Sequence, residues 1–121
     1  MAWDIEYTHQ FGEWWDSLDE PAQTAITRVV NLLEERGPKL AMPYAKLVNQ
    51  TTRHPIGELR VAHKGRPIRI FYVFDPRRVV ILLWGADKGS DQEHFYRYAL
   101  PKADKLYDEH LAQLRREGLI K

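Results

Sequence analysis

Two arginines in consecutive predicted strands have the spacing to bind an anion together. The Lys64-Gly65 pair separates two runs of alternating residues and predicts a two-residue hairpin loop, because glycine tolerates the positive φ that such a loop needs. In that register Arg60 lies directly opposite Arg69. Two opposed guanidinium groups repel each other unless an anion lies between them. That anion is either Glu58, which makes the pair structural, or a bound phosphate, which makes it functional.

Trp84 is predicted to lie beside the arginine pair. If Pro76-Arg77 forms a second two-residue loop, Arg69 lies opposite Trp84 in the third strand of the hairpin array. An indole face in that place can stack on a base or on a guanidinium group.

The same two registers divide the side chains between two sheet faces. One face is apolar and is expected to contact the two N-terminal helices; its residues are Leu59, Val61, Ile68, Ile70, Tyr72, Phe74, Val79, Ile81 and Leu83. The other face is basic at one end and apolar at the other; it carries Glu58, Arg60, Arg69, Phe71, Val73, Val80, Leu82 and Trp84.

Positive charge is concentrated in one part of the chain. The formal net charge is only +1, but residues 1–37 carry eight acids and two bases, whereas residues 53–78 carry seven bases and two acids. A segment this basic suits a polyanion such as RNA, DNA or an acidic protein. An ordinary solvated hairpin rich in arginine explains it equally well.

Periodicity predicts the elements that position these residues. Alternating or helical spacing of the apolar residues marks each segment, Ser17 to Glu20 has capping-box spacing, and Pro21 suits a first helical turn. The expected order is a strand (2–7), a helix (11–18), a helix (21–37), a loop (38–57) and three antiparallel strands (58–62, 67–74 and 79–85). Beyond residues 88–90 the chain is expected to turn helical, with a C-terminal helix from near Pro101 to near Gly118. We therefore predict one α+β domain over residues 1–121, with a small antiparallel sheet, two N-terminal helices on one face and a C-terminal helix.

Composition excludes several classes of protein. The 121 residues are 44% hydrophobic and 29% charged, which is typical of a globular domain. The absence of cysteine excludes disulfides, thiolate catalysis and cysteine-ligated zinc. No apolar run approaches the roughly 18 residues that span a bilayer, and the N-terminus lacks signal-peptide features. We expect a cytoplasmic protein with no membrane partner, no metal and no cofactor, since its five histidines lack zinc-ligand spacing.

Five segments, taken in order, carry a family resemblance. They are 14–18, 32–37, 58–61, 69–75 and 79–88, with the sequences WWDSL, LLEERG, ELRV, RIFYVFD and VVILLWGADK. Together they resemble the phage-derived Gp49-like/HigB branch of the RelE toxin superfamily, over nearly the whole chain. Members are toxins of type II toxin–antitoxin modules that cut messenger RNA, commonly on the ribosome. The HigB branch is usually neutralised by an antitoxin with a helix-turn-helix domain.

The resemblance implies a RelE-like fold and a metal-independent endoribonuclease that inhibits translation. It implies three partners: a HigA-like antitoxin, messenger RNA and the ribosome. By position, Arg60 matches the arginine of the family's E-L-R strand, Arg69 the arginine that opens the next strand, and Lys88 the lysine after the last strand's glycine. The chain departs from the family after Lys88, where residues 89–91 (GSD) replace further lysines.

Cleavage of RNA through the adjacent 2′-hydroxyl needs a base, cations that stabilise the phosphorane-like state, and an acid for the leaving 5′-oxygen. Arg60 and Arg69 suit the cationic role, because a guanidinium binds phosphate in a fork. Lys88 suits the role of base, or of a further clamp, if neighbouring cations lower its pKa. His94 and Tyr96 are candidates for proton transfer, or are parts of a segment that only packs.

Four further residues are predicted to contact RNA: His63, Lys64, Arg66 and Trp84. His63 is a candidate for proton transfer, or else a solvated turn residue. Lys64 and Arg66 are expected to add to electrostatic steering.

Two other functions stay open. The first is a non-catalytic module that binds nucleic acid or an acidic helix with the same basic face. The second is a structural subunit whose apolar patch (Phe71, Val73, Val80 and Leu82) is covered by the C-terminal helix or by a partner.

Overall fold

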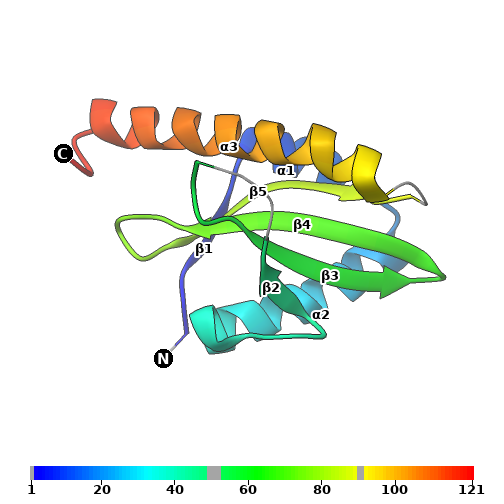
Figure 1. Cartoon of the computed structure of the whole chain (residues 1–121). Coiled ribbons are helices and arrows are strands. Elements are labelled where there is room, and N and C mark those ends of the chain that lie inside the picture. The colour runs from blue at the N-terminus through cyan, green and yellow to red at the C-terminus, as the bar shows by residue number, and fades with distance from the viewer. Residues whose placement is uncertain (1, 49–52, 90–91) are drawn as a thin grey trace.

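A five-stranded sheet forms the middle layer of the computed structural model, which describes residues 2–48, 53–89 and 92–121 (Figure 1). In chain order the elements are β1 (Ile5–Tyr7), α1 (His9–Asp16), α2 (Glu20–Arg36), the 3-10 turn η1 (Gly37–Lys39), β2 (Ala45–Leu47), β3 (Gly57–His63), β4 (Arg66–Phe74), β5 (Val80–Asp87) and α3 (Gln92–Arg116). The strand order is β1-β5-β4-β3-β2, antiparallel except that β1 runs parallel to β5. The predicted α+β class is confirmed, and the parallel β1 makes the sheet a mixed one.

The two N-terminal helices begin at side-chain caps. The Thr8 hydroxyl accepts the N–H of Phe11 at 3.0 Å, and the Asp19 carboxylate accepts the N–H of Ala22 at 2.9 Å. A capped helix start is therefore present near Glu20 as predicted, but the N-cap residue of α2 is Asp19 and not Ser17. The helix α2 ends at Gly37, whose φ of 55° a side chain would disfavour.

The predicted register of the first hairpin is confirmed. Arg60 pairs with Arg69, and the loop residues Lys64 and Gly65 have φ of 52° and 75°. Two consecutive positive φ angles match the right-handed twist of the two flanking strands.

The predicted register of the second hairpin is wrong. The N–H of Asp75 bonds the carbonyl of Val79 at 2.8 Å, so the loop has three residues rather than two. The last loop residue, Arg78, has a φ of 67°, and arginine has no preference for this conformation that the sequence could reveal. A bulge between Phe71 and Tyr72 shifts the pairing again, so that Arg69 faces Ala86 and not Trp84.

The extra loop residue exchanges the two faces of β5 from Val79 to Leu83, and the bulge restores the predicted face at Trp84. Val80 and Leu82 lie with α1 and α2, in the cluster that contains Leu59, Val61, Ile68, Ile70 and Tyr72. Val79, Ile81 and Leu83 lie instead with α3, together with Phe71 and Val73. The two N-terminal helices cover one face of the sheet, as predicted, and α3 covers the other (Figure 1).

The chain is helical from Gln92, as predicted for the segment beyond residues 88–90, but a single helix continues through Pro101 where a helix start was predicted. Phe95 and Ala99 are buried against the sheet before Pro101, so tertiary packing outweighs the helix-breaking effect of the proline. None of the helices described is both long and apolar enough to cross a membrane.

The predicted loop over residues 38–57 contains η1 and the edge strand β2. Pairing with β3 creates this short strand, and it places Lys46 opposite Glu58. Residues 49–52 of that loop, and Ser90 and Asp91 after β5, lie outside the described residues.

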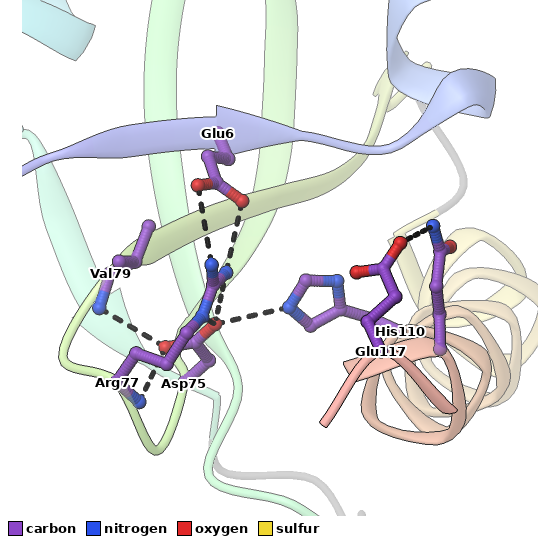
Figure 2. Close-up of polar contacts among 7 residues, drawn as sticks. Glu6, Asp75, Arg77, Val79, His110 and Glu117 are labelled. Atoms are coloured by element: carbon purple, nitrogen blue, oxygen red, sulfur yellow. Dashed lines mark hydrogen bonds and ion pairs between the residues drawn. The ribbon is translucent and has the colours of Figure 1, made fainter. Parts of the chain in front are cut away.

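A buried carboxylate fastens α3 to the rest of the fold. Asp75 accepts hydrogen bonds from the guanidinium of Arg77 at 2.7 Å, the N–H of Val79 at 3.1 Å and Nε2 of His110 at 3.1 Å, and Arg77 also reaches Glu6 at 2.9 Å (Figure 2). Burial alone would raise the pKa of Asp75, but the bonds from His110, Arg77 and Val79 outweigh it and hold the pKa below its usual value. The cluster ties β1, the β4–β5 turn and α3 together.

Gly85→Ala should lower the free energy of unfolding by about 1–3 kcal/mol, because a Cβ at position 85 would lie 2.3 Å from the ring of Trp14. Urea denaturation measures the loss. Gly12→Ala is the control: its Cβ meets only the edge of the exposed Tyr7 ring at 3.3 Å, and it should stay within about 1 kcal/mol of wild type. Equal stability of Gly85→Ala and wild type would contradict the tight approach of β5 to α1.

Asp75→Asn should reduce the sensitivity of the fold to acid. Since the folded-state pKa of Asp75 lies below the unfolded value of about 3.9, its stabilisation is present above that pH and is lost as pH falls through the folded-state pKa. The variant should lose about 1.5–3 kcal/mol at pH 7, and the wild-type advantage should shrink toward pH 2. Thermal melts against pH test this, with the exposed Asp4→Asn expected to melt like wild type. An advantage that persists undiminished in acid would refute it.

Candidate functional site

Glu58 lies at the centre of a cluster of cations on the α3 side of the sheet. Its side chain is completely buried, with Oε2 at 3.6 Å from Nη1 of Arg60 and Oε1 at 3.7 Å from Nε of Arg69. The anion between the opposed arginines is therefore a protein carboxylate. Of the two alternatives that the sequence left open, this is the structural one, and an arginine pair without a protein counter-ion is excluded.

Tyr96 closes the cluster from α3. Its hydroxyl donates a hydrogen bond to Oε1 of Glu58. Burial and the adjacent carboxylate raise the pKa of Tyr96 to about 12, against a partial opposing effect of Arg69. The phenol is therefore protonated at neutral pH, and it can donate a proton or a hydrogen bond but cannot act as a base.

Lys88 is held at the open side of the cluster, just after β5. Its N–H bonds the carbonyl of Pro67 at 2.7 Å, and its ammonium group bonds Oε1 of Gln92 at 3.1 Å. Burial, Arg69, Arg60 and Lys46 lower the pKa of Lys88, while Glu58 partly offsets them. A lysine whose pKa is lowered has a larger neutral fraction near pH 7 and is a better base than an isolated one.

The four cations around Glu58, namely Lys46, Arg60, Arg69 and Lys88, are called the basic cluster below. They differ in exposure: the side chain of Arg69 is 7% exposed and that of Arg60 28% exposed, while Lys88 is half-buried and Lys46 exposed. Arg69 also donates to the carbonyl of Ile68 at 3.0 Å. An incoming anion therefore meets Arg60, Lys88 and Lys46, with Arg69 behind them.

Sequence reasoning missed Lys46. The strand β2 that carries it has only three residues and is defined by its pairing with β3, which puts Lys46 opposite Glu58. The absence of acids from residues 38–52 was the only available signal.

Trp84 does not lie beside the arginine pair as predicted. It pairs with Phe71, is 9% exposed, and stacks with Phe71 and Phe95 in the core under α3. The ammonium group of Lys102 lies 4.7 Å from its ring centroid. The indole is thus a packing element, and its faces are occupied by protein.

The remaining predicted residues lie outside the basic cluster. His63 lines a hollow with Pro21 and Arg28 on the α2 side of the sheet. Lys64 is exposed in the β3–β4 turn, and Arg66 pairs with Asp87 at 2.8 Å.

His94 is exposed in the first turn of α3, two positions before Tyr96. Residues two apart on a helix point to opposite sides, so His94 is directed away from Glu58. Among residues 2–48, 53–89 and 92–121, no group of three or more histidine, aspartate or glutamate side chains could hold a metal ion.

Comparison with known proteins places this architecture in a family. The family pattern described as phage derived protein Gp49-like (DUF891) matches residues 13–108. A Mycobacterium tuberculosis (strain ATCC 25618 / H37Rv) protein that carries the name toxin HigB3 is 39% identical over 103 residues, which are 85% of this chain and 89% of that protein. A second protein of that strain, with the name toxin HigB2, is 33% identical over 93% of this chain, which spans 56% of its length.

Solved structures share the fold at low identity. The isolated Escherichia coli RelE toxin superposes with a TM-score of 0.56 and 10% identity, over 77% of this chain and 92% of that one. The RelE–RelB complex of Pyrococcus horikoshii OT3 gives a TM-score of 0.53 and 15% identity, over 74% and 98%. Such identities show a common fold, and the family match supplies the closer relation. The chain belongs to the Gp49-like family, is a relative of the HigB toxins and shares the fold of RelE.

Proposed function

We propose that this protein is the toxin of a type II toxin–antitoxin module and an endoribonuclease that cuts messenger RNA, with the ribosome as its working platform. The observation that carries the proposal is the basic cluster, in which three accessible cations surround a buried carboxylate and a protonated phenol. The names of the HigB relatives and the RelE-like fold support the same conclusion.

The exposed members of the basic cluster fit the phosphate that is cut. Arg60 presents a permanently charged fork to a phosphate oxygen, and Lys46 adds a second positive charge from β2. Arg69 is a positioning residue, because it is buried and acts through Glu58 and through the charge that it imposes on Lys88. Together they stabilise the extra negative charge of the phosphorane-like state.

Lys88 and Tyr96 fit the two proton transfers. Neutral Lys88 takes the proton of the 2′-hydroxyl, whose oxygen attacks the adjacent phosphorus and displaces the 5′-oxygen. That oxygen leaves with a proton from an acid, for which Tyr96 is the candidate, since His94 is directed away from the cluster. The products are a cyclic 2′,3′-phosphate and a free 5′-hydroxyl. Lys64 and Arg66 lie outside the reacting centre and contribute to RNA attraction.

The proposed partners follow from the superfamily. RelE toxins are seen in complexes with RelB antitoxins in the Escherichia coli and Pyrococcus horikoshii structures. We extend this to a cognate antitoxin for the present chain, of the HigA-like helix-turn-helix kind, acting in the cytoplasm. A non-catalytic module that binds nucleic acid through the same cluster is the alternative, and it differs in one observable: binding that weakens steeply with salt but leaves the RNA intact.

Arg60→Gln and Lys88→Gln should each reduce RNA cleavage by about 10²–10³-fold, since one removes phosphate stabilisation and the other the base. Induced expression without an antitoxin tests this through growth and through primer extension on cellular transcripts. Arg78→Gln is the matched control: it lies in the β4–β5 turn against Trp3 and should inhibit growth like wild type.

Each outcome has a distinct meaning. If the wild-type chain neither slows growth nor shortens transcripts, the proposed function is wrong. If both variants in the basic cluster stay fully toxic, the site is wrong although the function stands.

Arg60→Gln should also raise the pKa of Lys88, because the Arg60 charge helps to lower it. Glu58→Gln should have the opposite effect, because that carboxylate raises the pKa of Lys88. NMR titration of the lysine side chains measures both, with Arg78→Gln as the unshifted control. In single-turnover cleavage, the pH profile of Arg60→Gln should move to higher pH in parallel. Identical Lys88 titrations in all variants would contradict the electrostatic account.

A further inference from the structure

The outer edge of β1 carries backbone groups that point away from the sheet. The N–H of Val80 bonds the carbonyl of Asp4 at 2.9 Å, and the N–H of Thr8 bonds the carbonyl of Leu82 at 3.1 Å. Backbone groups of successive residues in a strand point to opposite edges, so those of Ile5 and Tyr7 point outward. In the described part of the chain β1 is a terminal strand of the sheet, and Tyr7 is 65% exposed. An edge of this kind is a template for another strand.

A groove lies on each side of that edge. On the α1/α2 side, an apolar groove of about 510 Å³ is lined by Ile5, Tyr7, Phe11, Trp15, Val30 and Leu82. On the α3 side, a polar groove of about 840 Å³ is lined by Glu6, Gln10, His110, Gln113 and Glu117, among others. Figure 2 shows Glu6 on β1 and His110 and Glu117 on α3. A strand added to β1 would alternate in the same way as β1 itself. Every second side chain would enter the apolar groove, and the others would enter the polar one.

The charge around this edge favours an incoming strand with positively charged side chains. Glu13 and Asp16 border the apolar groove, and Glu6, Glu109 and Glu117 border the polar one. The surrounding residues 1–37 carry eight acids and two bases. In the polar groove Glu6 and Arg77 neutralise each other, and Arg116 offsets one of the two remaining glutamates, so the groove keeps a small negative excess. A strand that alternates apolar and basic residues therefore complements both grooves.

Two of the antiparallel registers open to a second copy of this chain are disfavoured by charge. An antiparallel β1–β1 pair centred on Glu6 would place Glu6 against Glu6, and one centred on Ile5 would place Asp4 against Glu6. Like charges directly opposite each other on a sheet are destabilising.

We propose that the β1 edge is the docking site for an extended segment of the antitoxin, in which apolar residues alternate with lysine or arginine. This inference rests on the proposed function for the identity of the partner. The segment would extend the sheet beyond β1, with its apolar side chains over Phe11 and Trp15 and its basic side chains toward Glu109 and Glu117. The site is separate from the basic cluster, which lies toward the opposite edge of the sheet, where β2 and β3 pair.

The test uses the full-length chain and a nine-residue peptide of alternating valine and lysine as the probe. Titration followed by NMR should shift the amides of Ile5 and Tyr7, and the valine–glutamate counterpart should bind at least about tenfold more weakly because its charge is reversed. Tyr7→Pro removes one outward N–H without touching the ladder to β5, and it should weaken binding about tenfold.

Leu47→Pro is the matched control, because Leu47 is in β2, at the opposite edge of the sheet, and also points its N–H outward. It should bind the peptide like wild type. Unshifted β1 amides at saturating peptide, or an equal loss in Leu47→Pro, would overturn the proposal, and the wild-type titration decides even if Tyr7→Pro fails to fold. If the chain inhibits growth but the β1 amides do not shift with the peptide, the docking site alone is refuted. Peptide binding without growth inhibition would refute the toxin function alone.

Discussion

Two guanidinium groups on neighbouring strands can share a water-poor site only if an anion separates them, and Glu58 has that role here. The β3–β4 register fixes Arg60 opposite Arg69, and Glu58 reaches both from β3. The carboxylate cannot itself be buried without them, because an unpaired buried charge costs several kcal/mol. Each of the three groups thus depends on the other two. Tyr96 then joins α3 to the same carboxylate, so the site and the helix that covers it form one unit.

The sequence alone predicted those elements that are determined by residue types within the element itself. The first hairpin could be read because Lys64-Gly65 has the residue type that its turn demands. The second hairpin could not be predicted, because Arg78 adopts a positive φ for which arginine has no preference. Its loop therefore has one more residue than predicted, and this exchanges the faces of β5 after the loop. A helix start was wrongly predicted at Pro101, because proline suits a first turn, whereas α3 already begins at Gln92 and buries Phe95 before that residue.

The residues of the candidate site also fall into those that the sequence could predict and those that only the structure shows. Arg60, Arg69 and Lys88 were found because they follow from the well-defined hairpin and from the resemblance, and the structure brings them together with Tyr96. Trp84 was misassigned, because its position depended on the register that failed. Lys46 was missed because its strand exists only through pairing with β3, a contact between segments far apart in the sequence. Glu58 was weighed as the counter-ion, but only packing under α3 could show its complete burial.

The long C-terminal helix is held at two separate points. Tyr96 is bonded to Glu58 and His110 to Asp75, with a separation of 14 residues, or roughly 21 Å along the axis. Pro101 lies between these anchors and has no N–H to offer the carbonyl one turn before it. The resistance of α3 to bending is therefore lowest between Tyr96 and His110, near Pro101. The bond from Tyr96 to Glu58 must therefore hold the part of α3 above the arginines by itself, because the proline weakens the mechanical link to the anchor at Asp75.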